Sequence, residues 1–268
     1  MSREPVPFPS VPGYELRPLR RDDLPALLEI LLAEAAEAGV ESSASLPQLL
    51  REWEDPWSPP ETDSLCACDA ATGALVGVAR AYTKPEPAVR DAFSFLSLAL
   101  RPGAAPSGLA EALLDWAERT GRARLAGTAG PLPGVLRIPC DRKEESRAAL
   151  FERRGFAARR IYRRMRRALA EPIPEPELPE GLRALPYAPS YRDALREAFN
   201  ETFSDHWGFE PVTEEDWRLF FIDTEEFRPD LSWLALAGEE IAGYSINGVN
   251  EAECERLGER RAWISQLG

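Results

Sequence analysis

The stretch Ser64–Tyr82 reads SLCACDAATGALVGVARAY, and Ser232–Asn247 repeats its pattern as SWLALAGEEIAGYSIN. In each stretch, two mostly apolar runs flank a short turn that contains Gly73 or Gly238. Apolar runs of strand length around a glycine-containing turn are typical of an antiparallel β-hairpin. Because the pattern occurs in both halves of the 268-residue chain, we predict two related α/β units.

The elements around each hairpin follow the same order. In the first unit, strand, helix, helix, hairpin and strand are predicted at Tyr14–Leu19, Leu24–Ala38, Leu46–Trp53, Ser64–Tyr82 and Ala92–Leu100. In the second unit, the same elements are predicted at Gly181–Leu185, Tyr191–Phe203, Thr213–Ile222, Ser232–Asn247 and Arg261–Leu267. The sequence therefore predicts a tandem.

A segment rich in glutamate and proline separates the two units. Glu171–Glu180 reads EPIPEPELPE, in which the prolines lack backbone donors and the glutamates favour solvent, so we expect a linker. The predicted organisation is an amino-terminal domain at 1–170, a linker at 171–180 and a carboxyl-terminal domain at 181–268.

Only the first unit continues beyond its last strand in that series. A helix, a strand, a second helix and a long strand are predicted at Ser107–Thr120, Val135–Cys140, Glu144–Arg154 and Phe156–Leu169. The second unit reaches Gly268 before any counterpart of these elements. Because an unfinished sheet would leave an edge and an apolar face uncovered, we expect a fragment with a truncated second domain.

The charge of the chain argues against two classes of partner. With 45 acidic and 32 basic residues, the net charge is −13, which disfavours nucleic acid or an anionic membrane as the main partner. No apolar run approaches the roughly 20 residues of a membrane span, and no signal peptide is visible. We therefore expect a cytoplasmic protein.

The cysteines do not form a metal-binding pattern. Cys66 and Cys68 would share one face of a strand, while Cys140 and Cys254 are far from them in sequence. His206 is the only histidine in the sequence and is also distant. We expect small buried thiols and no metal site.

Two motifs of the first unit resemble those of a known family. Leu100–Ala110 reads LRPGAAPSGLA and is followed by EALL, and Leu150–Phe156 reads LFERRGF. Both are similar to motifs of the GNAT family of acyl-CoA-dependent N-acetyltransferases, and the tandem arrangement resembles the branch of that family that includes mycothiol synthase. The family fold is a mixed α/β sheet, in which a glycine-containing loop and a helix N-terminus bind the pyrophosphate of coenzyme A.

The resemblance implies acetyl-CoA as co-substrate and a primary amine of a small molecule as acceptor. Its cofactor strand and loop fall on residues of the first unit, namely Leu98, Ala99, Leu100, Gly108, Leu109 and Ala110. Two loop positions depart from the family pattern, since Ala105 replaces an Arg or Gln and Pro106 lacks an amide donor. Phe151 stands where many members have a tyrosine that protonates the leaving thiolate.

The first unit therefore resembles a degenerate copy, and the resemblance places the active site in the second unit. There the cofactor strand implies Gln266, Leu267 and Gly268 as acyl-CoA contacts, and the acceptor-side loop implies His206 and Trp207 as substrate contacts. No catalytic residue is assigned. His206 is either a base or a loop histidine, and Glu251, Glu253 and Glu255 are either base candidates or a solvated acidic loop.

Two other functions remain open from the sequence. The departures at Ala105, Pro106 and Phe151 favour a non-catalytic acyl-CoA-binding or interaction scaffold. The arginines of Arg159–Arg167 could bind nucleic acid, although on a strand they divide between two faces, which favours a solvated strand. The acceptor amine and the oligomeric state are not predicted.

Overall fold

The computed structural model describes residues 4–55, 57–83, 92–103, 108–128, 132–175 and 177–268. Their contacts divide the chain into two compact units. The first unit holds the residues up to 148, together with 206–210 and 255–258. The second unit holds 149–205, 211–254 and 259–268. The domain boundaries at 170 and 181 remain a prediction.

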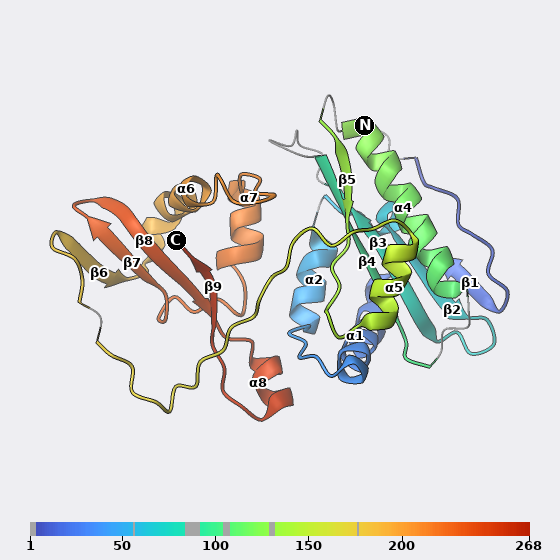
Figure 1. Cartoon of the computed structure of the whole chain (residues 1–268), viewed down its shortest axis with the longest axis horizontal. Coiled ribbons are helices and arrows are strands. Elements are labelled where there is room, and N and C mark those ends of the chain that lie inside the picture. Colours follow the sequence, from blue (N-terminus) through green and yellow to red (C-terminus); the bar gives the residue numbers. More distant parts are fainter. Residues whose placement is uncertain (1–3, 56, 84–91, 104–107, 129–131, 176) are drawn as a thin grey trace. The chain divides into compact units, whose positions relative to one another are not determined.

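The first unit is built on a five-stranded mixed sheet with strand order β1-β2-β3-β4-β5 (Figure 1). Its strands are β1 (Tyr14–Arg17), β2 (Ser64–Asp69), β3 (Leu75–Tyr82), β4 (Ala92–Leu100) and β5 (Gly134–Arg137). The first four strands pair antiparallel, whereas β4 and β5 pair parallel. A parallel pair needs a crossover connection, and the chain between β4 and β5 contains the helix that serves as one.

Helices lie on both faces of this sheet. The helices of this part of the chain are α1 (Leu24–Ala38), α2 (Leu46–Glu54), α3 (Pro60–Asp63), α4 (Leu109–Thr128) and α5 (Glu145–Arg153). Helix α1 packs on β3, β4 and α2, while α4 packs on β3, β4 and β5. Because alternate residues of a strand point to opposite faces, Val78 faces α1 whereas a side chain at Gly77 would meet Leu113 of α4.

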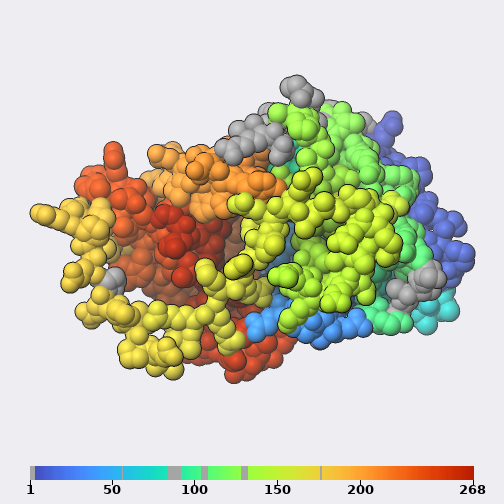
Figure 2. Space-filling model, viewed as in Figure 1, coloured from blue at the N-terminus to red at the C-terminus, as the bar shows by residue number. Residues whose placement is uncertain are grey.

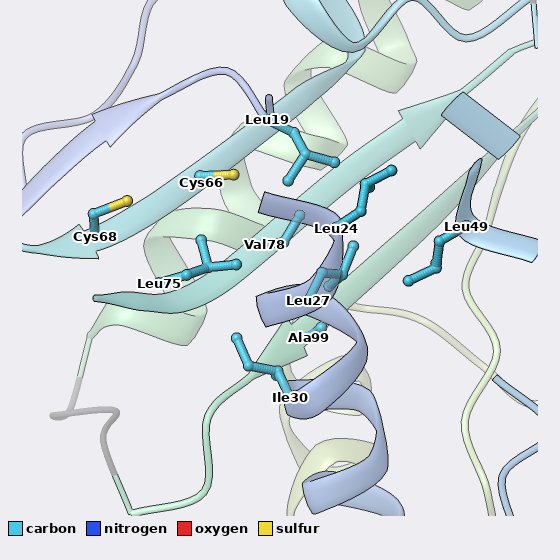
Figure 3. Packing of buried hydrophobic residues seen from close by; sticks show 10 residues of the cluster. All are labelled: Leu19, Leu24, Leu27, Ile30, Leu49, Cys66, Cys68, Leu75, Val78 and Ala99. Atoms are coloured by element: carbon cyan, nitrogen blue, oxygen red, sulfur yellow. The ribbon is translucent and has the colours of Figure 1, made fainter. Parts of the chain in front are cut away.

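The core beneath α1 explains the buried cysteines. Leu24, Leu27 and Ile30 recur at helical spacing and point toward the strands, where Figure 3 shows them facing Cys66 and Val78. Burial raises the pKa of the Cys66 thiol and keeps it unreactive. The expectation of small buried thiols is thus confirmed there.

Cys140 departs from that expectation, because its side chain is exposed. It lies outside the sheet, shortly after the end of β5 at Arg137.

Among the described residues, no three His, Cys, Asp or Glu side chains are placed to hold a metal ion. No helix in the described ranges is both long and apolar enough to cross a bilayer.

The second unit contains a four-stranded antiparallel sheet with strand order β6-β7-β8-β9. Its strands are β6 (Leu182–Pro186), β7 (Trp233–Ala237), β8 (Glu240–Gly248) and β9 (Trp263–Leu267). Its helices are α6 (Arg192–Thr202), α7 (Glu214–Trp217), which continues as a π-helical turn at Arg218–Ile222, and α8 (Glu251–Leu257). Phe199 packs against Trp217 and Phe221, so aromatic rings join α6 to α7.

The repeat extends to local irregularities. A 3₁₀ turn precedes α1 at Arg21–Asp23, and a matching one precedes α6 at Pro189–Tyr191. Both hairpins shift register at the same place, between Ala67 and Cys68 in one and between Ala235 and Leu236 in the other. A bulge redirects side chains along a strand and is a specific feature of a fold. The two units therefore have the same register shift in the hairpin and the same 3₁₀ turn before the first helix.

The predicted strand Phe156–Leu169 is wrong. Residues 156–168 form neither helix nor strand, and residues 157–170 are exposed. Adjacent arginines place charge on both faces of an extended chain, which removes the apolar face that a sheet strand would bury. The described residues of the linker 171–180 are likewise exposed and irregular, and Figure 2 shows this yellow stretch on the surface.

Gly121 of α4 allows the helix to approach the sheet closely. A β-carbon there would lie 2.8 Å from Leu136 Cδ2 and 2.9 Å from Ser94 Oγ. We predict that Gly121→Ala lowers the free energy of unfolding by about 1 kcal/mol, because overpacking costs about 1–3 kcal/mol and the gain of about 1 kcal/mol in helix propensity offsets only part of a typical cost of about 2 kcal/mol. Urea denaturation measures this difference.

Gly134→Ala is the matched control for this prediction. In β5, a β-carbon at Gly134 would lie 3.5 Å from Leu125 Cδ1, an ordinary van der Waals contact. Its stability should stay within about 0.5 kcal/mol of the parent, as for substitutions that disturb no special feature. Equal stability of Gly121→Ala and the parent would contradict the close approach of α4.

Candidate functional site

Strand β4 separates from its neighbour before it ends. Within the described residues, β4 pairs with β5 only from Ala92 to Phe95, although β4 continues to Leu100. Leu98 and Ala99 are buried, and Leu100 is half-buried. The divergence leaves backbone donors at the end of β4 without a partner strand, and such donors can bind the carbonyl groups of an extended ligand.

The donor of Leu100 is already engaged by a side chain. Its N–H donates to Glu34 Oε1 of α1 at 2.8 Å. The guanidinium of Arg147 in α5 also donates to Glu34 Oε1, and it pairs with Glu144 Oε1 at 2.9 Å. Burial raises the pKa of Glu34, and the charge of Arg147 partly offsets this effect. Sequence reasoning missed Glu34, because α1 alone gives no sign that this glutamate faces a strand end.

The loop after β4 leads into a helix N-terminus, as the sequence predicts. Gly108 has φ +105, a conformation that favours glycine, and α4 starts at Leu109. The side chain of Leu109 is fully buried and Ala110 is half-buried, so these residues present mainly backbone to a ligand. Ala105 and Pro106 lie outside the described residues.

Phe151 belongs to the core rather than to a solvent-facing site. It lies in α5, is 5% exposed, and its ring is 6.0 Å from that of Phe156. A phenylalanine has no group to donate a proton, so this position has no general acid.

In the second unit, β9 holds the expected cofactor residues. Gly268 exchanges two backbone hydrogen bonds with Tyr244 of β8, at 2.8 and 3.1 Å. Because strand donors alternate in direction, the N–H of Leu267 points away from β8. Among the described residues, β9 has no partner strand on that side. By ladder register, Leu267 and Gly268 are the counterparts of Leu98 and Ala99.

Tyr244 lies beside the end of β9 and is a residue that sequence reasoning missed. Its side chain is 4% exposed, and burial raises the pKa of its phenol. A β-carbon on Gly268 would lie 2.4 Å from the Tyr244 oxygen, so that ring and strand end are in contact. From the sequence, the position of Tyr244 in the hairpin indicates only that its side chain lies on one face of the sheet. It does not indicate the contact with Gly268.

The expectation of an acidic loop after β8 is wrong for Glu253. Residues 251–257 form α8, whose Glu253 N–H donates to Asn250 Oδ1 at 2.9 Å. The Glu253 side chain is 1% exposed and accepts a hydrogen bond of 2.7 Å from Trp263 Nε1 of β9. Glu251 and Glu255 are exposed, as expected. Glu253 therefore anchors the first residue of β9.

His206 and Trp207 follow α6 in an irregular segment. His206 is exposed, and Trp207 is 37% exposed. The contacts of residues 206–210 place them with the first unit, whereas β9 belongs to the second. Their grouping with Gln266–Gly268 in one substrate site is therefore still a prediction.

The Glu253–Trp263 hydrogen bond should stabilise β9. We predict that Glu253→Ala lowers the free energy of unfolding of the second unit by about 1–3 kcal/mol, because it leaves the indole N–H without its acceptor. Glu251→Ala, an exposed residue of the same helix, should change it by less than about 0.5 kcal/mol. Urea denaturation of both variants measures the difference, and similar values would exclude an anchoring role.

Part of the chain is similar in sequence to a known acetyltransferase. Mycothiol acetyltransferase from Salinispora tropica is 35% identical over 88 residues, which are 32% of this chain and 29% of that protein. The chain therefore matches less than a third of the length of this relative. No family model matches the chain.

Two solved structures resemble the whole chain. A GCN5-related N-acetyltransferase from Sphaerobacter thermophilus aligns over 98% of this chain and 77% of its own, with 22% identity and a TM-score of 0.69. Saccharomyces cerevisiae N-myristoyltransferase with bound myristoyl-CoA aligns over 92% of this chain and 60% of its own, with 16% identity and a TM-score of 0.55. These likenesses confirm the resemblance noted in the sequence: the chain has the acyl-CoA N-acyltransferase fold of the GCN5-related N-acetyltransferases.

Proposed function

We propose that the protein is an acetyl-CoA-dependent N-acetyltransferase that acts on a primary amine of a small molecule. The observation that carries this proposal is the outward-facing backbone edge of β9, at the end of a strand whose counterpart in the first unit diverges from its neighbour. The similarity to mycothiol acetyltransferase over 88 residues and the fold shared with a structure that holds myristoyl-CoA support the same class of reaction.

The reaction makes three demands on the site. The acceptor must reach the thioester as a neutral amine, so a base takes its ammonium proton. The amine nitrogen then forms a bond to the acetyl carbon, and a backbone N–H of the cofactor strand stabilises the oxyanion. When the carbon–sulfur bond breaks, coenzyme A leaves as a thiolate and is protonated. The products are an acetamide and the free thiol.

The residues proposed for these tasks lie in the carboxyl-terminal half. Gln266, Leu267 and Gly268 place the acyl-CoA, and the outward N–H of Leu267 is the donor best oriented for it. His206 and Trp207 are proposed to contact the amine. No residue is assigned as the base or as the acid, since the contacts of the described residues favour no single side chain for either role.

The second candidate function is a scaffold that binds acyl-CoA without turnover. One observation favours a lack of turnover in the first unit, namely the buried phenylalanine at position 151, which has no proton to donate. Calorimetric titration with acetyl-CoA and a free-thiol assay over a panel of amines separate the two functions. Release of coenzyme A with any amine supports the enzyme, while binding without release supports the scaffold.

A proline substitution tests the role proposed for β9. We predict that Leu267→Pro lowers the affinity for acetyl-CoA by about tenfold, the equivalent of one backbone hydrogen bond. Proline removes the outward N–H but leaves the Tyr244–Gly268 bonds to β8 in place. Calorimetry of the full chain measures the change.

Leu267→Ala is the matched control, because it removes the same exposed side chain and keeps the amide. Its affinity should stay within about twofold of the parent, since the Leu267 side chain is 67% exposed. Equal affinities of the proline and alanine variants would mean that acetyl-CoA does not use this edge of β9.

A further inference from the structure

We propose that Glu34 keeps the first unit from taking acyl-CoA, because its carboxylate occupies the backbone donor that such a ligand would use at the end of β4. This inference rests on the proposed function in one respect, since it takes this type of strand end as the acyl-CoA site. It adds that Glu34 is the residue by which the first unit differs from the second in its capacity to bind acyl-CoA.

The first observation is the direction in which the Leu100 N–H points. The next residue, Arg101, donates its N–H to Val76 O of β3 at 2.8 Å. Because successive donors point to opposite sides of a strand, the Leu100 N–H points away from β3, toward the side where β5 has already diverged. This is the position at which an extended ligand could add hydrogen bonds to β4. Glu34 Oε1 accepts from that N–H at 2.8 Å.

The carboxylate is held in place from α5 as well. Arg147 donates to the same oxygen, and its other terminal nitrogen pairs with Glu144 Oε1 at 2.9 Å. Lys143 Nζ donates to Gly39 O at the end of α1, at 2.6 Å. These contacts join the start of α5 to the second half of α1, directly beside the end of β4. The Glu34 side chain is only 10% exposed, so it is largely shielded from solvent.

A ligand would have to break several of these contacts together. A neutral carbonyl can replace the carboxylate at the Leu100 N–H, but it cannot neutralise Arg147. Displacing Glu34 would separate its carboxylate from Arg147 and leave Arg147 with Glu144 as its acidic partner, in a partly buried position, which is unfavourable. The internal contact is also intramolecular, so it forms without the entropy cost of binding a separate molecule. Both effects favour Glu34 over a bound acyl-CoA.

The second unit lacks an equivalent carboxylate. The 3₁₀ turns at Arg21–Asp23 and Pro189–Tyr191 are followed directly by α1 and α6, which sets a repeat offset of 168 residues. With this offset, Glu34 corresponds to Thr202, the last residue of α6. A threonine hydroxyl is shorter and uncharged, so it can form no ion pair of this kind. The difference agrees with the proposal that acyl-CoA binds in the second unit.

The number of acetyl-CoA molecules bound to the full chain tests this inference. Native mass spectrometry should show that Glu34→Ala binds one more equivalent than the parent. The control Glu29→Ala should show no gain, because Glu29 lies on the same helix, has a side chain that is 72% exposed and pairs with Arg101 at 3.7 Å rather than with a backbone N–H of β4. The double variant Glu34→Ala with Leu100→Pro should lose the additional equivalent, since proline removes the donor on β4.

The outcomes separate this inference from the proposed function. A parent that binds no acetyl-CoA, together with one equivalent on Glu34→Ala, supports the role of Glu34 and contradicts binding in the second unit. A folded Glu34→Ala variant with no gain overturns the inference, and so does a parent that already binds two equivalents. If circular dichroism shows that Glu34→Ala is unfolded, Glu34→Gln decides. It keeps the acceptor and loses the ion pair, so the extra equivalent should appear at a higher acetyl-CoA concentration, and its absence overturns the inference.

Discussion

A β-strand that separates from its neighbour leaves every second backbone N–H without a partner, and this constraint governs both units. Buried backbone donors are almost always hydrogen-bonded, so the end of β4, where Leu98 and Ala99 are buried, requires an acceptor. At β4 the acceptor is part of the chain, the carboxylate of Glu34. At β9 the outward N–H of Leu267 points away from β8, and it is the donor that we propose for acyl-CoA.

The contacts at the two strand ends differ: Glu34 accepts from the Leu100 N–H of β4, whereas the N–H of Leu267, the counterpart of Leu98, points away from β8. The units share the hairpin bulge, the 3₁₀ turn before the first helix and the strand order of the hairpin. They differ in side chains near the strand end, since Glu34 of the first unit corresponds to Thr202 of the second. The core beneath α1 consists of apolar contacts on the sheet face and does not include Glu34. A binding function can thus be lost while the scaffold persists.

Much of the fold follows from local patterns in the sequence. The bounds of Leu24–Ala38 and Ala92–Leu100 agree with the structure residue for residue, because helical periodicity and an apolar strand pattern are properties of consecutive residues. The strand predicted at Phe156–Leu169 failed where arginine pairs remove an apolar face. The contacts of Glu34 and Glu253 could not be predicted, since each depends on a partner brought in by the tertiary fold, such as Arg147 or Trp263. The resemblance to acetyltransferases, by contrast, rested on short motifs that need no such contacts.

The central claim is that the two strand ends differ in their capacity for acyl-CoA. Hydrogen exchange of the Leu267 and Leu100 amides, followed by NMR in the unmodified chain with and without acetyl-CoA, tests it most directly. Exchange at Leu267 should become slower on addition of acetyl-CoA, and exchange at Leu100, whose N–H donates to Glu34, should not change. Protection that appears at Leu100 and not at Leu267 would contradict the claim.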